Sequence, residues 1–149
     1  DGLMSTVGSA LPVAEGPRPS KVILASDAGI VFPSYGLIAT EKTLADRKPA
    51  LKKLVKVQQQ AWAHLASGKI DDGVQAMIKQ RPDAKLDPKV LAEQIKLTIE
   101  YFDTENTKGK PIGWQSEKDW SAALASLVAA GAIKEGAKPA DFFTNELVE

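Results

Sequence analysis

The sequence lacks cysteine and contains a single histidine, His64, among its 149 residues. The absence of cysteine excludes disulfide bonds, thiolate metal sites and cysteine nucleophiles. On a helix, the same-face neighbours of His64 would be Gln60, Ala61 and Ser67, none of which is a usual zinc or iron ligand. We therefore expect no metal site, no cofactor and no catalytic residue.

A surplus of charge is also missing, because 19 basic residues balance 19 acidic ones. No run of lysine or arginine exceeds two residues, so the sequence offers no field that would attract nucleic acid or an anionic membrane. No apolar run approaches the ~18 residues needed to span a bilayer. The start at Asp1 shows no basic-then-apolar signal segment, so a secreted relative would carry its signal upstream.

Short apolar runs are present near the start of the chain, at residues 21–25 and 35–40. Breaks rich in glycine, proline and serine flank these runs, such as residues 16–20 before the first of them. Runs of this length between such breaks are typical of buried strands. Residues 1–36 are accordingly predicted to be α/β material.

Helical periodicity begins at Pro49, which suits the first turn of a helix because proline lacks the N–H that such a turn leaves unpaired. Gly68 suits the end of this helix, and Trp62 lies on its apolar face as an expected core residue. A second helix is predicted from the cap Asp71 to Arg81, which precedes a proline.

Two further helices are predicted from their start signals. Asp87 followed by Pro88 is a cap-then-proline start. Ser116 with Asp119 three residues later resembles a capping box with a shorter acid than usual. Trp120 lies on the apolar face of this last helix and is predicted to be a structural residue.

The loop 26–36 is the candidate ligand site, because it mixes two aromatics with an acid, hydroxyls and glycines. Asp27 would supply the acid, and Tyr35 or Phe32 would supply a stacking face. An alternative interpretation is an ordinary turn in which Asp27 bonds its own backbone. The second-rank candidates, which follow the expected first strand, are Ser5 and Thr6.

The end of the chain carries an ordered series of motifs: GWQSEKDW at 113–120, GAI at 131–133 and PADFFTNE at 139–146. This series resembles the end of the substrate-binding proteins of bacterial importers for thiamine-pyrimidine precursors, alkanesulfonates, taurine and nitrate. The resemblance extends to YGLIAT at 35–40 and to DGLM at 1–4, and it matches the second half of such a protein.

The resemblance implies an α/β chain that forms part of a two-lobed, periplasmic-binding-protein-like (type II) fold, here a short strand-rich segment followed by at least four helices. Residues 1–36 would be a remnant of the second lobe with the ligand-cleft loop. Residues 37–149 would be the cross-lobe strand and the helical return into the first lobe. The implied function is the periplasmic solute-binding component of an ATP-driven importer, which takes a small heterocycle or sulfonate-like solute.

The implied partners are the solute, the membrane permease, and either the missing N-terminal half or a second copy of the chain. No nucleic acid is expected. One alternative is an enzyme of the same fold in thiamine-pyrimidine synthesis, against which the single histidine argues. Another is a helical interaction domain without a small ligand.

Overall fold

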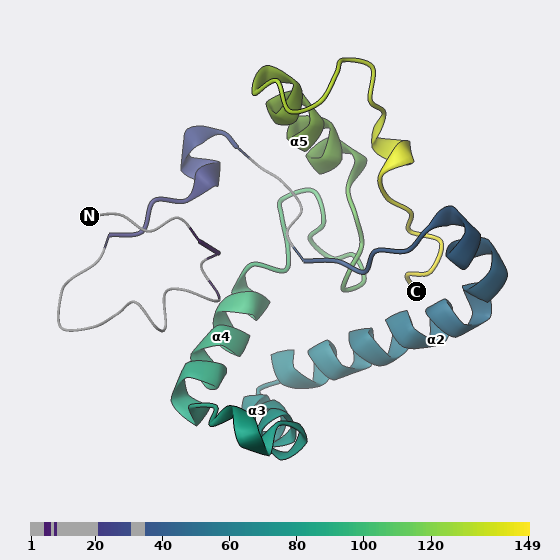
Figure 1. The fold of residues 1–149 in the computed structure, drawn as a ribbon. Helices are drawn as coiled ribbons and strands as arrows, with labels where there is room; N and C mark the ends of the chain where they lie inside the picture. The colour runs from purple at the N-terminus through teal and green to yellow at the C-terminus, as the bar shows by residue number, and fades with distance from the viewer. Residues whose placement is uncertain (1–4, 7, 9–20, 31–34) are drawn as a thin grey trace. The chain divides into compact units, whose positions relative to one another are not determined.

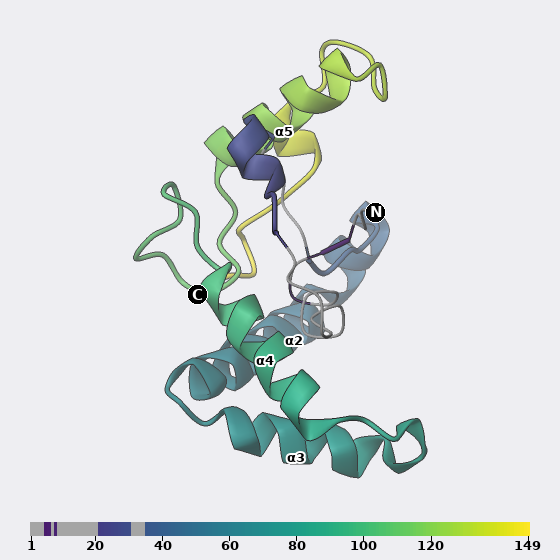
Figure 2. The ribbon, with the colours of Figure 1, turned by 90° about the vertical axis from the view of Figure 1, so that its left-hand side faces the viewer.

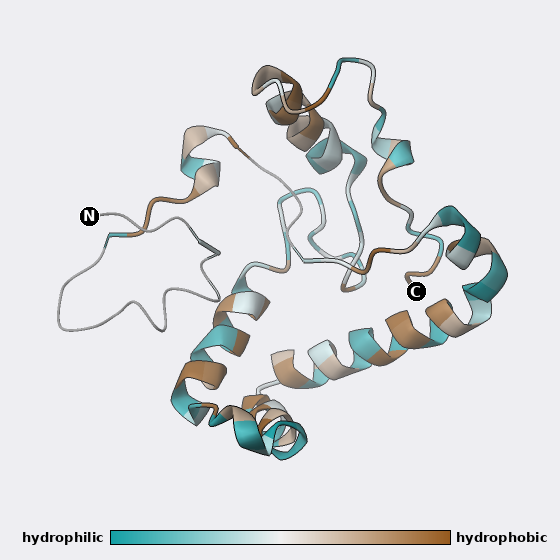
Figure 3. Ribbon diagram, viewed as in Figure 1, coloured by the Kyte–Doolittle hydropathy of each residue, from teal (hydrophilic) through white to brown (hydrophobic). Residues whose placement is uncertain are grey.

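The computed structural model describes residues 5, 6, 8, 21–30 and 35–149 (Figure 1). Its helices alternate hydrophobic and hydrophilic bands, as expected for helices with one packed face (Figure 3). Among the described residues, no helix is long and apolar enough to cross a membrane. The elements in chain order are η1 (Ala25–Ala28), α2 (Glu41–Ala66), α3 (Ile70–Gln80), η2 (Pro82–Ala84), α4 (Pro88–Glu100), α5 (Glu117–Ala129) and η3 (Pro139–Asp141).

The predicted α/β fold is wrong, because the described part of the chain is helical and contains no strand. The run 21–25 leads into the 3-10 helix η1, and the run 35–40 forms neither a helix nor a strand. A strand is stable only when a neighbouring strand pairs its backbone N–H and C=O groups. Apolar composition predicted the strands, but no described segment pairs with either run.

Helix α2 begins earlier than predicted and is kinked near Pro49. It begins at Glu41, eight positions before the predicted first turn at Pro49. Arg47 has non-helical angles (φ −123°, ψ 18°), so the helix is interrupted two residues before the proline. Proline interrupts the helical hydrogen-bond ladder, and its ring clashes with the preceding turn. Pro49 therefore lies in the first turn of the straight part of α2, as its chemistry predicts.

Contacts divide the chain into two compact units, which are described separately. The first comprises Asp1–Val22 and Gln60–Phe102, and the second comprises Ile23–Gln59 and Asp103–Glu149. The predicted lobe assignment of residues 1–36 and 37–149 stays a prediction.

In the first unit, α3 and α4 pack side by side, as both views show (Figures 1 and 2). Val74, Leu91 and Ile95 form the buried core. Trp62, predicted to be a core residue, packs against this core and meets Phe102 edge to face, with ring centroids 4.9 Å apart. Further apolar side chains that pack against the core are Leu65, Ile70, Ile78, Leu86, Ala92 and Ile99.

The predicted N-terminal cap of α4 is confirmed, whereas that of α3 is wrong. Asp87 caps α4 as predicted, because its Oδ1 accepts from the N–H groups of Lys89 and Val90 at 2.8 and 3.3 Å. Helix α3 begins at Ile70, so Asp71 lies in its first turn rather than at the cap. An acid in a first turn still interacts favourably with the helix dipole.

The second unit is built around α5, whose Ala123 and Leu124 are buried and which packs against η3. Ser116 caps α5 as predicted, because its Oγ accepts from the N–H of Asp119 at 3.3 Å. Gly131 follows the helix with a φ of 71°, a conformation that glycine adopts without strain. Helix α5 is thus the element on which the C-terminal motifs are assembled.

Candidate functional site

The predicted ligand residue Asp27 lies in η1, where it hydrogen-bonds the nearby backbone of Leu24. Its Oδ2 accepts from the N–H of Leu24 at 3.1 Å, and its N–H donates to the Leu24 carbonyl at 3.0 Å. This is the local contact that the alternative interpretation of the loop predicts. The Asp27 side chain is also exposed, so it is accessible to a solute.

The other predicted ligand residues are described only in part. Tyr35 is 73% exposed. Ser5 and Thr6 are exposed, and they belong to the first unit, whereas Asp27 and Tyr35 belong to the second. Phe32 lies outside the described residues. A shared site for the five residues therefore stays a prediction.

The C-terminal motifs come together in the second unit through Gln115 and Asn145. The N–H of Gln115 donates to Asn145 Oδ1 at 2.8 Å, and Asn145 Nδ2 donates to the Gln115 carbonyl at 2.8 Å. One amide side chain therefore satisfies both backbone groups of a residue thirty positions away. This pairing fixes the last turn of the chain beside the segment that enters α5.

Trp120 is the aromatic centre of the same region. Its ring stacks on Phe142 and on Phe143, with centroid separations of 5.9 and 5.8 Å. Its Nε1 donates to Gln115 Oε1 at 3.0 Å, which connects the ring to the Asn145 pairing. Trp120 is half-buried rather than fully buried, and its structural role stays a prediction. We call Gln115, Trp120, Phe142, Phe143 and Asn145 the C-terminal closure.

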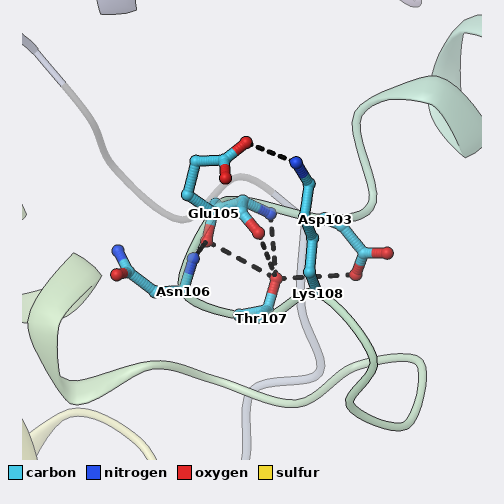
Figure 4. Close-up of polar contacts among 6 residues, drawn as sticks. Asp103, Glu105, Asn106, Thr107 and Lys108 are labelled. Carbon is cyan, nitrogen blue, oxygen red and sulfur yellow. Dashed lines mark hydrogen bonds and ion pairs between the residues drawn. The ribbon is translucent and has the colours of Figure 1, made fainter.

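Asp119 connects α5 to the loop 103–108, a contact that the sequence did not predict. Its carboxylate accepts from Thr104 Oγ1 at 2.6 Å and from the Asn106 side-chain amide. Within the loop, the N–H of Thr104 donates to Thr107 Oγ1 at 2.9 Å. Thr107 Oγ1 in turn lies 3.5 Å from Asp103 Oδ1, to which it donates (Figure 4). Asp119 and Thr107 are both buried. Buried polar groups are normally hydrogen-bonded, and these contacts supply the partners.

His64 also has a partner that helical spacing did not reveal. Its Nε2 lies 2.7 Å from Asp72 Oδ2, in the first turn of α3, and both side chains are more than half exposed. Across the described ranges, no three His, Asp or Glu side chains gather closely enough to hold a metal ion. The contact joins the end of α2 to α3.

An open pocket of about 430 Å³ lies beside α5 in the second unit. Small apolar side chains and backbone line it, with Ser121 and Glu135 as the polar groups. The sequence predicted no pocket here, although Pro139 belongs to the motif at 139–146. The other lining residues are Leu124, Ala125, Val128, Ala129, Gly136, Ala137 and Pro139.

Comparison with known proteins gives no relative from which a function could be transferred. No protein-family model matches the chain, and no significant match was found among curated proteins or solved structures. A functional interpretation therefore rests on the residues and contacts described above.

Proposed function

We propose that this chain is part of the periplasmic solute-binding component of an ATP-driven importer and helps to bind a small organic solute. The C-terminal closure carries the proposal. The motifs at 113–120 and 139–146 prompted the resemblance to such proteins, and their residues contact one another in one packed unit. The packed contact between these two motifs is the observation on which the proposal rests.

The proposal assigns solute contact to Asp27 and Tyr35, which are exposed in the second unit. A carboxylate and a phenol ring suit a neutral or cationic heterocycle, because one group accepts hydrogen bonds and the other offers a stacking face. Phe32, Ser5 and Thr6 remain further candidates. The local bond from Leu24 to Oδ2 would hold the Asp27 side chain in place without excluding a second contact.

Thermal shift measurements with a panel of solutes test the proposal. The panel contains taurine, a short alkanesulfonate, nitrate and an aminopyrimidine. A solute that binds only the folded chain stabilises it by about 2.7 kcal/mol at a hundredfold excess over Kd. We expect one solute to raise Tm in the parent protein and in the control Asp83→Asn, which changes an exposed acid of η2. The rise should be smaller in Asp27→Asn.

The same samples separate binding from catalysis. A binding protein returns its solute unchanged, whereas an enzyme of thiamine-pyrimidine synthesis converts it. We expect the NMR spectrum of the recovered solute to be identical to that of the starting material. A Tm that no solute raises would count against the proposal, and conversion of the solute would favour the enzyme.

A helical interaction domain is the second candidate, favoured by apolar side chains that are exposed in the second unit. Tyr35, Leu37 and Ile38 are 73, 55 and 99% exposed. Exposed apolar side chains of this kind favour association with another protein surface. The proposed partners are a second copy of the chain, a complementary half or a permease. Light scattering after size exclusion tests self-association. A single species near 15.9 kDa would contradict it.

A further inference from the structure

A row of lysines lies on one face of α2, and the last residues of the chain lie along it. Lys48, Lys52 and Lys56 follow one another at four-residue intervals, which places them on the same face of the helix. Lys48 Nζ contacts Glu146 Oε2 at 2.5 Å, and Lys52 Nζ contacts Glu149 Oε1 at 2.6 Å. Lys56 Nζ lies 3.9 Å from the other oxygen of Glu149. We call the three lysines the lysine row and residues 145–149 the acidic tail.

Gln59 adds hydrogen bonds to main-chain oxygens on the same side of α2. It lies on the same helix face, and its Nε2 donates to the backbone carbonyl of Glu149 at 3.3 Å and to that of Ile112 at 2.9 Å. The face therefore binds carboxylates and a backbone carbonyl together. The described segment that lies on this face, residues 146–149, is itself a peptide that presents two carboxylates at the spacing of the lysines. These contacts favour an acidic peptide over a membrane as occupant.

The ion pairs between the acidic tail and the lysine row are exposed, so another anionic segment can replace the tail. The paired side chains of Lys48, Lys52, Glu146 and Glu149 are between 38 and 49% exposed. Exposed ion pairs stabilise only weakly and are screened by salt. The tail nevertheless stays close when released, because its first residue, Asn145, is held by two hydrogen bonds to the backbone of Gln115. The tail can thus leave the lysine row without opening the C-terminal closure.

We propose that the lysine row and Gln59 form a docking site for acidic peptide segments, and that the acidic tail occupies this site as an internal competitor. The matching feature is a pair of glutamates three residues apart, which meets lysines four residues apart on the helix. A tethered competitor acts at a high effective concentration. An external acidic segment can bind only those molecules whose tail has left the lysine row. Its apparent affinity is therefore the intrinsic affinity multiplied by the fraction of such molecules.

Fluorescence anisotropy on the full chain tests this proposal. The probe is a dye-labelled, C-terminally amidated peptide with the sequence of residues 144–149, TNELVE. The variant Glu146→Gln with Glu149→Gln neutralises the internal competitor and should bind the probe about three- to tenfold more tightly than the parent. Adding Lys52→Gln to this variant should weaken binding again by a similar factor.

Lys53→Gln is the matched control, because it removes the same charge one residue along the helix, about a quarter of a turn from Lys52. It should leave the affinity within twofold, and a peptide with both glutamates replaced by glutamine should bind at least tenfold more weakly. The proposal is overturned if neutralising the tail does not tighten binding, or if Lys53→Gln weakens it as much as Lys52→Gln. It is also overturned if phosphatidylserine vesicles displace the probe at matched anion concentration, which would indicate a membrane surface instead.

Discussion

Asn145 and Gln115 exchange two hydrogen bonds of 2.8 Å, and these bonds fix the end of the chain to the segment that enters α5. Replacing Asn145 with alanine would leave the N–H and the carbonyl of a partly buried backbone unpaired. We expect Asn145→Ala to lower the free energy of unfolding by about 1–3 kcal/mol in urea denaturation. Asn145→Asp should also be destabilising, because its carboxylate would face the Gln115 carbonyl. Stability equal to the parent in both variants would show that the pairing does not hold the closure.

Trp120 should contribute through its two stacked phenylalanines. Because it is only half-buried, Trp120→Ala should cost about 2 kcal/mol, less than the ~3–5 kcal/mol of a fully buried aromatic residue. Trp120→Phe should recover part of this loss, since a phenyl ring can still stack but cannot donate to Gln115. Near-UV circular dichroism and thermal melts check both variants. Equal losses in the two would indicate that stacking contributes little.

Asp119 should be more sensitive to substitution than the exposed acids of the chain. It is buried, and Thr104 and Asn106 both donate to its carboxylate. We expect Asp119→Ala to lower stability by about 2–3 kcal/mol, because hydrogen bonds to a charged group are lost and the donors stay unpaired. Glu117→Ala, at an exposed position of the same helix turn, is the control. A similar small effect in both variants would contradict the role of Asp119.

Glu149 provides a pH-dependent prediction. The hydrogen bond and the positive charge of Lys52 lower the pKa of Glu149 below its ordinary 4.5, with a further contribution from the charge of Lys56. A pKa that is lower in the folded state means that the contact stabilises fully above the unfolded value and is lost as the pH falls through the folded one. Lys52→Gln should therefore raise the pKa of Glu149 in a carboxyl-carbon NMR titration, whereas Lys53→Gln should not. Identical titration curves in the two variants would show that Lys52 does not contact Glu149 in solution.

Local signals in the sequence predicted the helices, because a cap acts within a few residues of itself. Asp87 and Ser116 cap α4 and α5 where their patterns placed them. The strand predictions at 21–25 and 35–40 failed, because pairing depends on a partner strand that composition does not reveal.

The candidate site was predictable only as a set of residue types. Asp27 was identified as a polar loop residue, and its bond to Leu24 followed from turn chemistry. The Asn145–Gln115 pairing joins residues thirty positions apart, so no helical or turn periodicity reports it. The sequence placed Asp119 in a capping box with Ser116. Its carboxylate instead accepts hydrogen bonds from Thr104 and Asn106, in a loop earlier in the chain.

Isothermal titration calorimetry with the solute that raises Tm most is the most direct test of the proposed function. We predict a saturable, one-to-one binding isotherm for the parent protein, and an affinity about five- to a hundredfold weaker for Asp27→Ala and for Tyr35→Phe, since each removes a polar partner. Both variants should melt within about two degrees of the parent, because both side chains are exposed. No saturable heat with any member of the panel, or unchanged affinity in both variants, would contradict the account.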